Sequence, residues 1–164
     1  MKHIFALLVL LPFLGKAQDC TLKKDRDAYT KEMRYSTGFL SIGGGNKISI
    51  EATPKDIDLL FVIGGGVCFN DATVAVVNFD STKARMNLKN TGTMNCEGFF
   101  HFTVRNTQET NYNLQRLIDQ KMAIVTFTTD QEKMVVKLTQ EQMVMVRKAL
   151  ICLVTQAKAL IPTD

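Results

Sequence analysis

The residue in this chain best suited to acid–base chemistry is a single histidine. His101 is the only histidine after residue 3, and an imidazole titrates near neutral pH. The nearest carboxylate in the sequence belongs to Glu97. In a strand the two side chains would share a face but lie about 13–14 Å apart, too far for a direct pair. No G-x-S-x-G or H-E-x-x-H signature is present. We therefore predict no catalytic residues and a structural or surface role for His101.

Two triple-glycine stretches raise the question of a phosphate-binding loop. They lie at residues 64–66 in "FVIGGGVCFND" and at residues 43–45 in "SIGGGNKISI". A phosphate-binding glycine loop follows a strand and opens a helix, whose free N–H groups face the anion. Both stretches instead lead to strand-like sequence, without a Lys-Ser/Thr pair. We expect tight turns or bulges with positive φ at these glycines.

The other polar clusters do not match known metal sites. Asp56 with Asp58, and Asn70 with Asp71, lack the alternating ligands and the terminal Glu of a calcium loop. No two cysteines have a C-x2-4-C spacing. Because Asn and Asp commonly form turns, we expect neither a metal ion nor a cofactor.

The first residues have the layout of a secretory signal peptide. Lys2 precedes an apolar run over residues 4–14, and the small residues Gly15 and Ala17 precede the expected cleavage site. The run is shorter than the roughly 20 residues that cross a bilayer. The sequence therefore predicts removal of residues 1–17 and export to the periplasm or the medium, without a membrane span.

All four cysteines follow the signal peptide, so export predicts two disulfides. Cys20, Cys68, Cys96 and Cys152 allow three pairings. In the C-terminal helix predicted below, Cys152 projects away from the apolar stripe, toward whatever crosses the outer side of that helix. The segment that carries Cys20 suits this place. We therefore favour Cys20–Cys152 with Cys68–Cys96 over the other two pairings.

The charge of the chain does not indicate a polyanionic partner. Loss of Lys2 and Lys16 with the signal peptide leaves 18 basic against 16 acidic residues, a formal charge of +2. The basic residues are scattered, and only Lys23-Lys24 and Arg147-Lys148 are adjacent. Because nucleic-acid binders concentrate positive charge, we expect no nucleic-acid partner. The protein should be a monomer or a weak homo-oligomer.

The remaining sequence predicts a single α+β domain. Residues 18–35 are polar and charged and should form an N-terminal arm, followed by the domain over residues 36–164. Tight connections such as "GGGN" and "DST" predict antiparallel hairpins. We expect a sheet of about eight strands, curled into a partial barrel or sandwich. Runs rich in β-branched and aromatic residues place these strands at residues 35–42, 47–52, 57–63, 72–79, 83–89, 94–104, 122–128 and 132–138.

Two helices complete the predicted domain. A short helix is expected over residues 112–121. Thr139 and Gln142 have the spacing of a capping box and open a long C-terminal helix without Gly or Pro before Pro162. The apolar stripe that should pack on the sheet comprises Met143, Val146, Leu150, Val154, Ala157 and Ile161.

The strand around His101 contains a second candidate interaction residue. Alternation places Phe100 and Phe102 on the inner face and Phe99 with His101 on the outer, mostly solvated face. Phe99 is a large apolar residue on this otherwise polar outer face. It either packs beneath the arm or the short helix, or it belongs to an exposed apolar patch that binds a partner.

Several segments together resemble a group of small exported bacterial proteins of uncharacterised function. They are the charged arm "KKDRDAYT", the hairpin "DLLFVIGGGVCF" to "NFD", "NCEGFF", "LQRLIDQKMAIVTF" and "ALICL". The resemblance implies an antiparallel β-rich body with a C-terminal helix, and it transfers no active site.

Export and the missing catalytic spacing predict a non-catalytic module that binds a protein or another envelope component. The alternative is a secreted hydrolase whose groups assemble around His101 only in three dimensions. A pocket that holds His101 within hydrogen-bond reach of a carboxylate and a hydroxyl would favour the enzyme. A solvated His101 on a convex face would disfavour it.

Overall fold

Nine strands and two α-helices make up the described part of the chain. The computed structural model describes residues 21–162. In this range the helices are α1 (Tyr112–Asp119) and α2 (Gln140–Ala157), with short 3-10 helices η1 (Gly43–Gly45) and η2 (Lys158–Leu160). The strands are β1 (Lys23–Arg26), β2 (Met33–Ser41), β3 (Lys47–Ala52), β4 (Asp56–Val62), β5 (Val74–Phe79), β6 (Arg85–Lys89), β7 (Phe99–Arg105), β8 (Met122–Thr128) and β9 (Lys133–Lys137).

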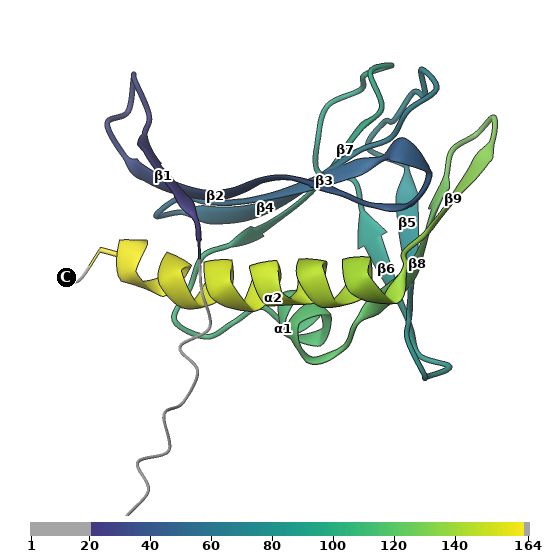
Figure 1. Cartoon of the computed structure of the whole chain (residues 1–164). Coiled ribbons are helices and arrows are strands. Elements are labelled where there is room, and N and C mark those ends of the chain that lie inside the picture. The colour runs from purple at the N-terminus through teal and green to yellow at the C-terminus, as the bar shows by residue number, and fades with distance from the viewer. Residues whose placement is uncertain (1–20, 163–164) are drawn as a thin grey trace, which may run out of the picture.

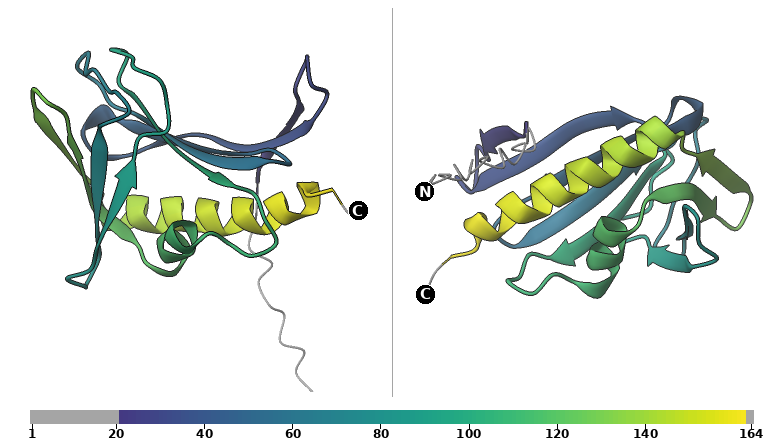
Figure 2. Two further views of the ribbon diagram at one scale, coloured as in Figure 1. Left: turned by 180° about the vertical axis from the view of Figure 1, so that it is seen from behind. Right: turned by 60° about the horizontal axis from the view of Figure 1, so that its bottom comes forward.

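The strands form two antiparallel sheets. The five-stranded sheet has the order β1-β2-β3-β4-β7, and the four-stranded sheet has the order β6-β5-β8-β9. Helix α2 runs across one face of the five-stranded sheet, and its N-terminal end lies beside the four-stranded sheet (Figures 1 and 2). Helix α1 packs beside α2. The predicted α+β class is confirmed, with strands divided between two sheets.

Four phenylalanines join the two sheets in the core. Phe61 and Phe100 come from the five-stranded sheet, Phe127 from the four-stranded sheet and Phe69 from the loop after β4, and all four are at most 1% exposed. The Phe127 ring centroid lies 5.1 Å from that of Phe100 and 5.5 Å from that of Phe61, both edge-to-face. Each buried ring contributes about 1.5–3 kcal/mol, and such ring pairs add about 0.5–1.5 kcal/mol. The cluster therefore fixes one sheet against the other.

The C-terminal helix begins and packs largely as predicted. The Thr139 hydroxyl accepts from the Gln142 N–H, and the Gln142 side chain accepts from the Thr139 N–H, so the capping box is confirmed. The predicted stripe is buried except for Ile161, which is half-buried, and Leu153 joins it. Ile161 departs from the stripe because α2 ends at Ala157 and η2 turns the chain.

The predicted N-terminal arm contains a strand. β1 pairs with β2 along its whole length, and all four of its residues are exposed. Because no β1 side chain is buried, the sequence "KKDR" carries no alternation of apolar and polar residues that would reveal a strand. Charged side chains on an edge strand also discourage further pairing. The predicted signal peptide, residues 1–17, lies outside the described residues.

One of the two predicted disulfides is confirmed. Cys68 is bonded to Cys96 and thereby joins the β4–β5 loop to the β6–β7 loop. The same loops are also paired at the isolated bridge Phe69–Asn95. In the other predicted pair, Cys20 lies outside the described residues, and Cys152 does not carry a free thiol.

The glycine stretches form turns, as predicted. In the stretch at residues 64–66, Gly65 and Gly66 have φ of 96° and 69°, a region that residues with a Cβ rarely adopt. The stretch leads through the β4–β5 loop to β5 and not into a helix. It bends the chain and presents no helix N-terminus to an anion.

Candidate functional site

The outer face of the β4–β7 pair holds His101 and its neighbours. In this ladder Asp58 is opposite Thr103, and Leu60 is opposite His101. The alternate residues Phe100 and Phe102 point inward and are buried. Burial of these phenylalanines fixes the register, and a fixed register presents the polar side chains on the solvent side.

Asp58 joins the imidazole and a hydroxyl in one hydrogen-bond network. His101 Nδ1 lies 2.8 Å from Asp58 Oδ2, and the Thr103 hydroxyl donates to Asp58 Oδ1 at 2.7 Å. Thr91 Oγ1 lies 2.9 Å from Thr103 Oγ1. An ionised carboxylate only accepts, so Nδ1 carries the proton and Nε2 of the neutral ring is an acceptor. The network fixes both the orientation and the tautomer of His101.

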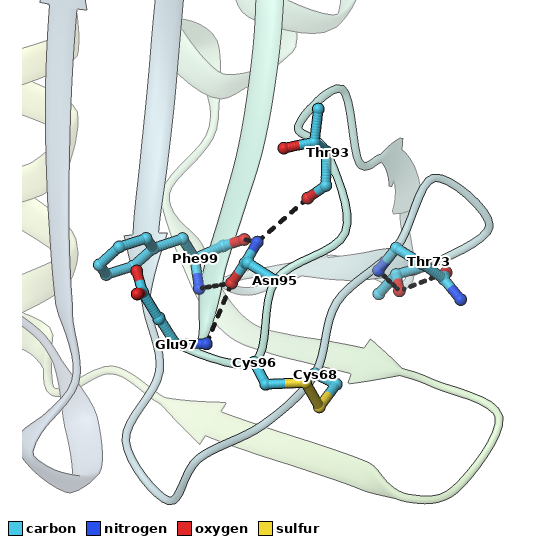
Figure 3. The surroundings of a disulfide bond; sticks show 8 residues. Cys68, Thr73, Thr93, Asn95, Cys96, Glu97 and Phe99 are labelled. Carbon is cyan, nitrogen blue, oxygen red and sulfur yellow. Dashed lines mark hydrogen bonds between the residues drawn. A yellow bond between two sulfur atoms is a disulfide. The ribbon is translucent and has the colours of Figure 1, made fainter.

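The loop before β7 closes the free edge of that strand with side chains. Asn95 Oδ1 accepts from the Phe99 N–H at 3.0 Å, and Asn95 Nδ2 donates to the Phe99 carbonyl at 2.9 Å (Figure 3). Two residues further, the His101 N–H donates to Asn90 Oδ1 and the Thr91 N–H donates to the His101 carbonyl, both at 2.9 Å. These contacts take the place of a neighbouring strand and hold the loop beside the outer face.

Gly92 lets this loop approach the imidazole. A Cβ at position 92 would lie 2.9 Å from His101 Cδ2. Since non-bonded carbon atoms are normally about 3.5–4.0 Å apart, any side chain here would displace the ring or the loop. Gly92 is therefore a positioning residue for His101.

An open hollow of about 470 Å³ lies between the loop and the sheet. Its lining includes Phe99 and His101, so the structure brings the two predicted interaction residues together. Phe99 is half-buried in this wall. Figure 3 shows the Glu97 side chain beside the Phe99 ring. The lining contains one carboxylate and no Lys or Arg, which makes it a poor site for an anion.

The structure corrects the predicted start of the strand that carries His101 and reveals the partner of this histidine. The predicted strand over residues 94–104 begins only at Phe99, because the preceding residues form the side-chain-capped loop. The partner of His101 is Asp58, 43 residues away in the chain. No local spacing reveals such a contact, although the alternating pattern of the two strands places both residues on outer faces.

The site lacks the parts of a nucleophilic triad. Within residues 21–162, Asp58 is the only hydrogen-bond partner of the His101 side chain. No Ser, Thr or Cys side chain is bonded to Nε2 there, as a triad requires. In the same range no three His, Cys, Asp or Glu side chains lie close enough to hold a metal ion.

Comparison of the chain with protein-family models, curated proteins and solved structures gives no match. The resemblance to small exported bacterial proteins therefore stays a prediction. None of the helices between residues 21 and 162 has the length and apolar character needed to span a bilayer.

Proposed function

We propose that the protein is an exported, non-catalytic binding module of the cell envelope and that the hollow beside His101 and Phe99 is its ligand site. The observation that carries the proposal is the hydrogen-bonded wall of this hollow. Asp58 holds the imidazole, Thr103 donates to Asp58 and Thr91 is bonded to Thr103, while Asn95 holds the backbone of Phe99. Pre-organised side chains reduce the entropy that binding would otherwise cost.

The chemistry of the hollow favours a ligand rich in hydrogen-bond donors. Because Nδ1 of His101 donates to Asp58, Nε2 of an unprotonated ring accepts hydrogen bonds, as does the Glu97 carboxylate. No Lys or Arg lines the hollow. The Phe99 ring offers an apolar surface to the same ligand. Hydroxyl or amine groups next to an apolar patch match this combination, whereas phosphate or carboxylate groups do not.

A photo-crosslinking experiment tests the binding proposal. Thr93 is exposed and lines the hollow, while Tyr29 is 95% exposed in the β1–β2 turn and serves as a matched control. A benzoylphenylalanine at position 93 should crosslink a specific component of the native envelope. Phe99→Ala should remove that product. A product that forms equally from position 29, or none from position 93, would contradict the proposal.

The hydrolase alternative is favoured by one observation, the 2.8 Å contact between His101 and Asp58. With Nδ1 held by a carboxylate, Nε2 could take a proton from a bound water, and such general-base assistance accelerates hydrolysis about 10²–10⁴-fold. We expect hydrolysis of activated esters to stay at the same background rate in the wild type and in His101→Ala. A rate that falls at least 100-fold in both His101→Ala and Asp58→Ala would establish an enzyme.

A further inference from the structure

The outer face of the four-stranded sheet is a grid of three cross-strand rows. The pairing registers define each row, in the order β6, β5, β8, β9. We call these twelve residues the basic face. The rows are Lys89-Val74-Thr128-Lys133, Asn87-Val76-Thr126-Val135 and Arg85-Asn78-Ile124-Lys137.

A cation occupies every corner of the basic face, and none of its twelve residues is acidic. The four corner residues Arg85, Lys89, Lys133 and Lys137 are exposed. None of them forms an ion pair with a carboxylate in the described part of the chain. The grid is therefore uniformly positive, in a protein whose formal charge without residues 1–17 is only +2.

The spacing of the corners explains how the fold tolerates them. Four residues along a strand span about 13–14 Å, and three inter-strand spacings also span about 14 Å. These distances exceed the Debye length of about 8 Å at physiological salt, so the cations repel one another weakly. A planar anionic partner, in contrast, would contact all four at once.

Four apolar side chains, Val74, Val76, Ile124 and Val135, lie among polar ones between the corners of the basic face. Val135 is 51% exposed, and Val76 and Ile124 are half-buried. Thr126 lies between Val76 and Val135. A hollow of about 250 Å³ opens on the same face and is lined by Val76, Asn78, Arg85, Thr126, Thr128 and Lys133. Separated cations with small apolar side chains between them fit the headgroup layer of a bilayer, where cations meet phosphates and small apolar side chains enter the interface. A linear polyanion would instead match a single stripe of charge.

We propose that the basic face docks the protein on an anionic lipid bilayer. The charges that carry the proposal belong to strands β6 and β9, and it does not depend on the hollow beside His101. The contact is peripheral, because a sheet face makes it and it requires no element that spans the membrane.

Vesicle flotation with the protein, expressed from its full sequence, tests this docking. The vesicles contain phosphatidylcholine with or without phosphatidylglycerol. The test variant is Arg85→Gln/Lys89→Gln/Lys133→Gln/Lys137→Gln. The matched control Lys23→Gln/Lys31→Gln/Lys47→Gln/Lys148→Gln removes the same charge at exposed residues elsewhere. Circular dichroism checks that both variants remain folded.

Binding to phosphatidylglycerol vesicles is expected for the wild type and the control variant, and it should weaken at high salt. Each cation near an anionic surface strengthens binding about five-fold, so the test variant should lose several hundred-fold. Val135→Ser should lower vesicle affinity modestly, because it removes apolar contact. Equal losses in test and control variants, or binding to soluble heparin but not to vesicles, would overturn the proposal.

Discussion

The outer faces of the two sheets carry charge in different ways. On the five-stranded sheet Arg34 and Arg105 have carboxylates beside them, and on the basic face no carboxylate is present. The ion pairs on the five-stranded sheet are Arg34–Asp25 at 3.1 Å, Arg34–Glu51 at 3.6 Å and Arg105–Asp56 at 3.8 Å. On the same sheet Asp58 holds the His101 ring at 2.8 Å. The same sheet also carries the loop that forms the hollow.

This difference teaches what each face contributes. Exposed ion pairs stabilise a fold by only about 0–1 kcal/mol each, but together they order side chains, as Asp58 orders His101. Unpaired cations add nothing to the stability of the fold. We explain their regular placement by a partner outside the chain. The ordered side chains beside His101 therefore support a ligand site on one sheet, and the unpaired cations support a docking surface on the other.

The largest effect should follow from removal of the disulfide that ties down the hollow. Cys68→Ser/Cys96→Ser opens a crosslink with a sequence separation of 28, and the loop-entropy model gives a loss of about 3–4 kcal/mol in the free energy of unfolding. Urea denaturation measures this loss. Vesicle binding by the folded fraction should not change, since the basic face lies on the other sheet. A loss below about 1 kcal/mol would contradict this role of the crosslink.

A smaller loss should follow from Asp58→Ala. The substitution leaves His101 Nδ1 and the Thr103 hydroxyl without their acceptor, which costs about 1–2 kcal/mol at a half-buried site. Asn87→Ala on the basic face is the matched control and should stay within about 0.5 kcal/mol. Thermal and urea unfolding of both variants test the contrast. Equal stability of the two would mean that the Asp58 network does not order its face.

Much of the fold could be predicted because buried apolar residues recur in the sequence with the period of a strand or a helix. The alternation in β5 and β7 and the capping box at Thr139 follow from local periodicity. The Cys68–Cys96 pair is favoured because the expected orientation of Cys152 assigns that cysteine to Cys20. β1 could not be predicted, because none of its side chains is buried.

The two surfaces were harder to predict than the fold. Spacings of four residues place Arg85 with Lys89, and Lys133 with Lys137, on common faces of their strands. That these strands belong to one sheet depends on the pairing of β5 with β8, which no local signal specifies. The Asp58–His101 contact was hidden for the same reason, since it depends on the pairing of β4 with β7.

Acid should reveal the contribution of a carboxylate at the end of β5 in the four-stranded sheet. Asp80 follows β5 and lies 2.6 Å from Lys121 Nζ. The hydrogen bond from Lys121 holds the pKa of Asp80 below its ordinary value. This pKa is lower in the folded state than in the unfolded state, so the pair stabilises the protein above about pH 4, and its contribution disappears as the pH falls through the folded-state pKa.

Asp80→Asn should therefore lose less stability than the wild type when the pH is lowered from about 5 to 2. Lys121→Met, which removes the partner, should flatten the curve in the same direction. Melting temperature against pH is the measurement. Parallel curves for the wild type and both variants would show that Asp80 gains nothing from Lys121.

The smallest effect on stability is expected at the basic face itself. Lys133→Gln removes a cation without a carboxylate partner, so the free energy of unfolding should change by less than about 0.5 kcal/mol, with any gain confined to low salt. Arg34→Gln is the counterpart on the five-stranded sheet and removes two ion pairs. A larger loss in Lys133→Gln than in Arg34→Gln would contradict the contrast between the faces.

Residue-resolved NMR tests most directly whether the four-stranded sheet, and not the five-stranded sheet, contacts the bilayer. Amide spectra recorded while bicelles containing phosphatidylglycerol are added should show shifts and broadening in β5, β6, β8 and β9. The amides of Asp58 and His101 should stay unchanged. Perturbations centred on β4 and β7, or spread evenly over both sheets, would contradict the assignment of the bilayer contact to the basic face.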